Sequence, residues 1–304
     1  MSRLSGYVNR NMIVGGIILM LAGNFMFALN DAMGKWLVAS FSVGQVVFVR
    51  SVGAFIILGP LIVRQGTHKL FHLGRIGLQV MRVIATALDT LLFYAAVVYL
   101  PLADVMSFYM AGPIYVALLS HIFLKEKVGW RRWLAIILGF CGVLVMLNPS
   151  SAALTIESLY ALVGSITFAI AIVLSRVLRG TSDTALVTWQ TIGVGVGGGL
   201  LAVGSWQHVP AIDYGAMLLL GVVSSVAHLM ITRALKMAPA STLAPLHYTL
   251  LLWAVVFGIL FFNDVPGPRI LIGGGIVVLA GLFIFHRQNV QATVPPENVP
   301  KGVN

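Results

Sequence analysis

Charged side chains are scarce in this chain of 304 residues, because Asp, Glu, Lys and Arg together make up only 9% of it. Soluble domains contain about 25% of these four residue types. Hydrophobic residues account for 59% of the chain, and its mean hydropathy is +0.98. A soluble fold of this length has too little interior to bury so much apolar surface. The composition excludes an ordinary cytosolic enzyme and indicates a protein that lies in a lipid bilayer.

Cysteine is almost missing as well. Cys141 is the only one, which excludes a disulfide framework and a cysteine-rich metal site. The glycine-rich runs Gly193–Gly199 and Gly273–Gly275 lack the Lys followed by Ser or Thr that an ATP-binding loop requires. Both runs lie in apolar segments, where small residues let helices approach closely. We therefore expect no metal, no cofactor and no ATP-binding site.

Ten apolar runs are long enough to cross a bilayer, which takes about 20 helical residues. In chain order they are Met12–Val38, Gly44–Val63, Gly77–Tyr99, Leu102–Leu124, Trp130–Leu147, Leu159–Leu178, Thr184–Ser205, Tyr214–Leu235, Ser241–Phe262 and Ile270–His286. Short polar gaps separate them. The sequence therefore predicts an all-α polytopic membrane protein with ten transmembrane helices.

The net charge of +10 is unevenly distributed between the two sides of this predicted bundle. Of the 19 Lys and Arg residues, 15 fall at the two ends and in alternate gaps, whereas the opposite gaps contain only Arg269. Cytoplasmic loops carry such an excess of basic residues. We expect a multi-pass protein of a bacterial inner (plasma) membrane with both termini in the cytoplasm. Since membrane insertion explains the charge, we expect no nucleic-acid partner.

The chain also resembles itself. A shift of 138 positions places Leu92–Arg131 on Met230–Arg269, and a shift of 141 places Gly23–Leu37 on Gly164–Leu178. Two matches at nearly the same offset predict a duplication of a five-helix unit. The units are residues 1–148 and 149–287, followed by a cytoplasmic tail of residues 288–304. Because five is odd, the second unit enters the membrane from the opposite side, as in the inverted repeats of secondary transporters.

Four segments carry a resemblance to a known family. The run FLKEKVGWRRWLAIILGFCGVLVML at Phe123–Leu147 resembles the closing motif of EamA-type carriers in the drug/metabolite transporter superfamily. Phe261–Ile284 resembles the same motif, with Asp264 in place of the usual Glu. Ala95–Val105 and Arg233–Tyr248 are similar to the family's junctions between the third and fourth helix of each half. The resemblance covers nearly the whole chain.

This resemblance implies a ten-helix exporter. Its central cavity would be lined by helices one, three and four and by their mates six, eight and nine. Bacterial members of this type are often exporters of amino acids and other metabolites, and one branch prefers aromatic amino acids. Lys35 and Arg50 fall where the family usually has a Lys and an Arg.

Charged residues inside a membrane are costly and become functional candidates. Asp31 and Lys35 are four apart on one face of the first predicted helix. Arg50 in the next helix is expected at nearly the depth of Asp31, which predicts a structural ion pair between the two. The alternative is that Asp31 or Lys35 faces the cavity and meets a substrate. Arg82, near the inner end of the third helix, is expected to extend toward the membrane surface.

Asp89 is a mid-membrane acid with no basic residue close in sequence. Such an acid is either neutral and hydrogen-bonded or part of a proton relay, and both interpretations stay open. The 138-residue shift places Thr90 on His228, so Asp89 and His228 are expected to approach the centre from opposite halves. His228 also fits a polar helix-packing role.

The same shift places Tyr109 on His247 and Met110 on Tyr248, beside internal prolines that bend the helices. These polar-tipped aromatic residues are expected to line the cavity and stack on a substrate, although aromatic residues also simply fill helix contacts. The predicted substrate-binding residues are Asp89, Tyr109, His228, His247, Tyr248 and Lys35.

The sequence thus predicts a secondary transporter that exports small metabolites, with amino acids as the expected substrates, by alternating access through a central cavity. The alternatives are a carrier of nucleotide-sugar or sugar-phosphate type and an intramembrane enzyme. Ser224 and His228 lie four apart on one helix, but neighbours on one helix face seldom form a productive nucleophile and base. We therefore expect no enzyme. The partners are a small-molecule substrate and the lipid bilayer, with monomer and homodimer both open.

Overall fold

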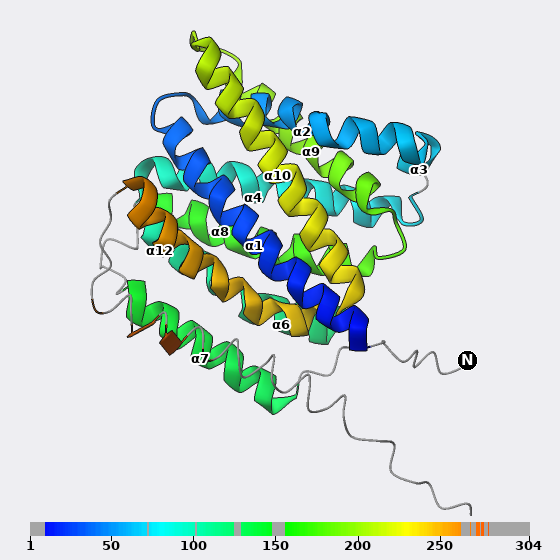
Figure 1. Cartoon of the computed structure of the whole chain (residues 1–304), viewed down its shortest axis with the longest axis vertical. Helices are drawn as coiled ribbons and strands as arrows, with labels where there is room; N and C mark the ends of the chain where they lie inside the picture. Colours follow the sequence, from blue (N-terminus) through cyan, green and yellow to red (C-terminus); the bar gives the residue numbers. More distant parts are fainter. Residues whose placement is uncertain are drawn as a thin grey trace, which may run out of the picture.

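The computed structural model describes residues 10–71, 73–100, 102–124, 129–147 and 156–262, with a few positions between 268 and 279. Within them the chain is helical (Figure 1). The elements are α1 (Arg10–Val38), α2 (Val43–Gln65), α3 (His68–Phe71), α4 (Ile76–Tyr99), α5 (Leu102–Tyr109), α6 (Gly112–Leu124), α7 (Trp130–Leu147), α8 (Ile156–Val177), α9 (Asp183–Ala202), α10 (Ala211–Met237), α11 (Ala240–Leu243), the 3₁₀ segment η2 (Ala244–Tyr248) and α12 (Thr249–Phe262).

Every predicted span except the last coincides with one of these helices or with a broken helix. Among the described residues, six helices are long and apolar enough by length and composition to cross a membrane, namely α1, α2, α4, α8, α9 and α10. The all-α polytopic fold is confirmed. Most of the tenth span, Ile270–His286, lies outside the described residues, as do Asp264, Arg269 and the predicted tail.

Two of the predicted spans are interrupted. The span Leu102–Leu124 consists of α5 and α6, which are separated at Met110 and Ala111. The span Ser241–Phe262 consists of α11, η2 and α12. Proline lacks the N–H group that continues a helix and clashes with the preceding turn. Pro113 lies in the first turn of α6, and η2 has Pro245 near its start. Both breaks lie beside the centre of the molecule.

Helices of the two predicted halves pack against each other rather than forming separate bundles. α1 runs along α10, α4 along α8 and α9, and α2 along α9 and α10 (Figure 1). α7 lies at one edge of the molecule. In the predicted repeat, α1 corresponds to α8 and α4 corresponds to α10. The α1–α10 pair of the molecule would then correspond to the α4–α8 pair. Both the twofold relation and its inverted sense stay predictions.

Glycine allows α2 and α10 to cross with their backbones in contact. A Cβ atom added at Gly53 would lie 2.6 Å from Leu218 Cα. One added at Gly221 would lie 2.6 Å from the backbone nitrogen of Ala54 and would collide with the carbonyl oxygen of Arg50. No side chain fits at either position, so the crossing depends on small residues as membrane helix contacts often do.

Candidate substrate cavity

A cavity lies at the centre, between the α1–α10 pair and the α4–α8 pair. Residues from α1, α4, α5, α8, α10, η2 and α12 form its wall, which are the helices that the family resemblance implies. α2 adds Arg50. Four predicted site residues come together here, namely Asp89, Tyr109, His228 and His247. That they bind a substrate stays a prediction.

Asp89 is held by a tyrosine of the broken helix. The Tyr109 hydroxyl donates a hydrogen bond of 2.8 Å to Asp89 Oδ1. The Tyr109 ring packs edge-on against Phe93 and also meets Phe168, with centroids 5.5 Å and 5.9 Å away. Tyr109 therefore fixes the carboxyl group of Asp89 while its ring forms part of an aromatic wall.

Arg50 and Asp31 both line the cavity, and Asn30 connects them. Asn30 Nδ2 donates to Asp31 Oδ1 at 3.1 Å, and Asn30 Oδ1 accepts from Arg50 Nη1 at 3.5 Å. Arg50 Nη1 also donates to the Tyr94 hydroxyl at 3.0 Å. In this conformation the predicted contact between Asp31 and Arg50 is indirect. An amide fits between them because it offers both a donor and an acceptor.

Aromatic rings cross the cavity from both halves. Phe27 of α1 meets His228 of α10 at 4.7 Å between centroids, and Phe168 of α8 meets His247 at 5.3 Å. His228 Nδ1 lies 2.8 Å from the carbonyl oxygen of Ser224. A carbonyl oxygen only accepts, so Nδ1 carries the hydrogen and the neutral ring keeps Nε2 as an acceptor. Since Nδ1 is engaged by the backbone, it is not available as a base for the Ser224 hydroxyl.

His247 differs from His228 in its surroundings. It is 1% exposed, and neither ring nitrogen has a hydrogen-bond partner among the described residues. Buried polar groups are usually paired, because an unpaired one forfeits its hydration. The ring lines the cavity, so a bound molecule or water is a natural partner for its nitrogens.

Two predicted site residues lie elsewhere. Tyr248 does not line the cavity; its hydroxyl donates to the carbonyl oxygen of Ile136 at 2.8 Å and connects η2 to α7. Successive residues of a 3₁₀ helix point about 120° apart, so His247 and Tyr248 cannot face the same space. Lys35 is half-buried in the last turn of α1 and is not part of the cavity wall.

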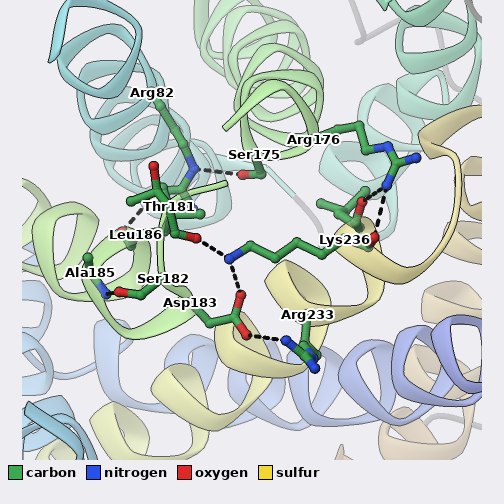
Figure 2. Close-up of polar contacts among 11 residues, drawn as sticks. Arg82, Ser175, Arg176, Thr181, Ser182, Asp183, Ala185, Leu186, Arg233 and Lys236 are labelled. Carbon is green, nitrogen blue, oxygen red and sulfur yellow. Dashed lines mark hydrogen bonds and ion pairs between the residues drawn. The ribbon is translucent and has the colours of Figure 1, made fainter. Parts of the chain in front are cut away.

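Arg82 is buried in the helix bundle and does not extend to the surface as expected, since its side chain is 2% exposed. Its Nε donates to Ser175 Oγ at 2.6 Å and its Nη1 to the carbonyl oxygen of Leu186 at 2.9 Å (Figure 2). Its Nη2 donates to Gln190 Oε1 at 2.6 Å. Acceptors on α8 and α9 therefore replace water. Ser175 and Gln190 are polar residues inside apolar spans, and this was the signal available in the sequence.

A polar cluster joins the α8–α9 turn to the end of α10 (Figure 2). Lys236 Nζ lies 2.6 Å from Asp183 Oδ1 and also donates to the carbonyl oxygen of Thr181. Arg233 Nη1 lies 3.5 Å from Asp183 Oδ2. Arg176 Nη1 donates to the carbonyl oxygens of Leu235 and Lys236 at 2.7 Å and 3.1 Å. We call the contacts of Thr181, Asp183, Arg233 and Lys236 the latch.

The family model described as "EamA-like transporter family" matches residues 14–148 and 155–286, most of the chain. The chain belongs to the EamA-like transporter family. Each match falls within one predicted five-helix unit. This family membership makes the protein a multi-pass membrane transporter, as the closing motifs in the sequence predicted.

Curated relatives of this EamA transporter carry several substrates. This chain is 25% identical over 278 residues to an S-adenosylmethionine uptake transporter of Rickettsia bellii, and the match covers 90% of this chain and 94% of the relative. It is 26% identical to a riboflavin transporter of Vibrio cholerae, with 88% and 92% covered. It is 28% identical over 276 residues to the pseudopaline exporter CntI of Pseudomonas aeruginosa, with 89% and 95% covered. Transport of small metabolites is common to them.

A solved structure has the same fold. It covers 93% of this chain and 99% of its own, with a TM-score of 0.76 and 13% sequence identity. At this identity the likeness concerns the fold alone.

Proposed function

We propose that this transporter exports amino acids with an aromatic or large apolar side chain across a bacterial inner membrane, by alternating access through the central cavity. The observation that carries the proposal is the combination of both charge signs with aromatic walls in one cavity. Asp31, Asp89 and Arg50 supply the charges, and Phe93 and Phe168 are among the rings. A zwitterion with an apolar side chain matches all three kinds of surface.

Each part of an amino acid has a suitable partner in the wall. An ammonium group pairs with the carboxylate of Asp89, which Tyr109 holds in place. A carboxylate pairs with Arg50, whose planar guanidinium suits carboxylate geometry. The side chain packs on the aromatic rings, where offset and edge contacts are favourable. The unpaired nitrogens of His247 offer a further polar contact.

The charges also favour an amino acid over a sugar phosphate or a nucleotide sugar. Among the described residues that line the central cavity, two carboxyl groups lie beside one guanidinium, that of Arg50. A phosphate group carries up to two negative charges and would be repelled by ionised acids. The cavity therefore disfavours an anion, whereas an amino acid brings an ammonium group as well as a carboxylate.

We infer the direction of transport and the identity of the membrane from the sequence. The excess of Lys and Arg in alternate gaps supports an inner-membrane protein with cytoplasmic termini. The relatives include both an uptake transporter and an exporter, so the outward direction rests on the resemblance to amino-acid exporters. Gradients of substrate or of protons would supply the energy.

Counterflow into proteoliposomes tests the proposal. Vesicles that contain the purified protein are loaded with an unlabelled amino acid, nucleoside, sugar or nucleotide sugar, and entry of the labelled compound is measured. We expect phenylalanine or tryptophan to exchange fastest. Vesicles without protein and vesicles with the Asp213→Asn variant are the controls, since Asp213 lies in the first turn of α10, away from the cavity. Exchange of nucleotide sugars with none of amino acids would reject the proposal.

A further inference from the structure

Arg82 borders a separate arm of the cavity. The arm shares Phe27, Asp89, Phe168 and His228 with the central cavity. Its further lining residues include Arg82, Ser175 and residues of α10 down to Leu235. The Leu235 carbonyl oxygen accepts from Arg176 next to the latch. The arm therefore runs from the central cavity toward the latch.

The guanidinium of Arg82 has hydrogen-bonding capacity left. Arginine carries five N–H donors, and three of them meet Ser175, Leu186 and Gln190. All three acceptors are neutral, and no described carboxylate lies within ion-pair distance. A buried charge without a counter-ion is costly in a membrane protein. An anion in the arm would compensate the charge and occupy the remaining donors.

We propose that Arg82 forms a second anion-binding position of the transport path, which takes the carboxylate of the substrate when the arm is open. The proposal rests on the proposed function and adds a residue and a place to it. Arg50 adjoins the central cavity and Arg82 the arm, while Asp89 borders both. The ammonium group of an amino acid stays near Asp89 while its carboxylate passes from Arg82 to Arg50.

Polar side chains connect the two guanidinium groups. A small cavity is bordered by Arg50, Thr86, Gln190 and His228. Gln190 accepts from Arg82 on its other side. The carboxylate therefore moves past polar groups between its two positions, and it does not have to cross a purely apolar barrier.

A structural role of Arg82 predicts a different result from a binding role. If Arg82 only ties α4 to α8 and α9, its loss weakens transport of every compound equally. If it binds the carboxylate, its loss affects only compounds that have one. Phenylalanine and phenethylamine separate the two cases, because phenethylamine is phenylalanine without its carboxylate.

The first experiment compares counterflow of these two probes in wild type, Arg82→Gln and Arg82→Lys. We expect Arg82→Gln to slow phenylalanine roughly tenfold or more, the effect of losing a charge-assisted hydrogen bond, and to leave phenethylamine unchanged. Arg82→Lys keeps the charge and should lose less. Arg179→Gln is the matched control, since Arg179 is exposed beyond the end of α8. Equal loss of both probes, or wild-type rates for phenylalanine, would overturn the proposal.

The second experiment needs neither transport nor a stable Arg82→Gln variant. Crystals of the full-length wild-type protein are soaked in sodium iodide, and the anomalous signal locates the anions. We expect an iodide ion beside Arg82 in the arm and a weaker signal in Arg82→Lys. An arm without iodide contradicts the anion position. If iodide binds there but no amino acid is transported, the proposed function fails while the anion position stands.

Discussion

The contact between Asp89 and Tyr109 allows the negative charge of Asp89 to be tested separately from its hydrogen bond. The Tyr109 hydroxyl donates to Asp89 Oδ1, and an asparagine has a carbonyl oxygen at the same place. Asp89→Asn therefore keeps the hydrogen bond and removes only the negative charge. We expect counterflow of amino acids to fall roughly tenfold or more, as for the loss of one charged contact, with little change in melting temperature. A fully active Asp89→Asn variant would show that the acid is not the ammonium partner.

His247 and Tyr248 are neighbours in sequence with opposite surroundings, and their variants should differ accordingly. His247→Phe keeps a ring against Phe168 and removes both nitrogens, so we expect slower counterflow and unchanged stability. Tyr248→Phe loses the bond to Ile136, which should cost about 1 kcal/mol of stability without slowing transport. Counterflow and thermal melting of both purified variants check this. The reversed pattern would contradict the assignment of the two residues.

For single residues, the sequence predicted how far along a helix each side chain lies better than the direction in which it points from the helix axis. The predicted repeat indicated that Asp89, Tyr109, His228 and His247 approach the centre, and all four line the cavity. The direction of each side chain depends on neighbours that the sequence does not name. Tyr248 and Arg82 illustrate this, since the carbonyl oxygen of Ile136 and the acceptors on α8 and α9 decide where they point.

At the scale of the helices, the latch connects the α8–α9 turn to α10, although these helices pack mainly against other helices. α10 runs along α1 and α2, and α8 runs along α4. The ion pair of Asp183 and Lys236 connects the α8–α9 turn to α10 at the end of the arm. We therefore expect that opening the arm at this end requires the latch to separate.

Loss of the latch should expose the arm. In a Cys141→Ser background, Thr232→Cys places the only thiol of the chain in the wall of the arm. Adding Asp183→Asn removes the acid that Lys236 and Arg233 share. We expect this thiol to react several-fold faster with a maleimide reagent, because the open state becomes more populated. Asp213→Asn in the same background is the control. An unchanged rate would mean that the latch does not limit access.

The helix boundaries were the most predictable feature at this scale. Hydropathy placed α4 and α7 to within one residue, since polar gaps mark the ends of membrane spans. The prolines indicated bends, but not that Leu102–Leu124 and Ser241–Phe262 would each separate into shorter pieces. The extent of a break depends on how neighbouring helices provide hydrogen-bond partners for the backbone N–H and C=O groups that the break leaves unpaired.

For the whole molecule, the inverted relation of the halves predicts that equivalent turns lie on opposite sides of the membrane. The α1–α2 turn at Ser40 corresponds to the α8–α9 turn near Gly180 under the 141-residue shift. In a Cys141→Ser background, we expect Ser40→Cys to react with an impermeant maleimide in intact cells. Gly180→Cys should react only after the cells are permeabilised. Labelling of both from the same side would refute the inverted repeat.

We expect the crossing of α2 and α10 at Gly53 and Gly221 to be the point about which these helices pivot. Two backbones are in direct contact there, so no side-chain rotamer can adjust, and we expect the helices to tilt about this point. Lys236 lies 15 residues beyond Gly221 on α10, a lever arm of about 22 Å at 1.5 Å per residue. A tilt of roughly 10° would displace that end by about 4 Å. Since the contact between Lys236 and Asp183 is 2.6 Å long, we expect a displacement of this size to break it and to open the far end.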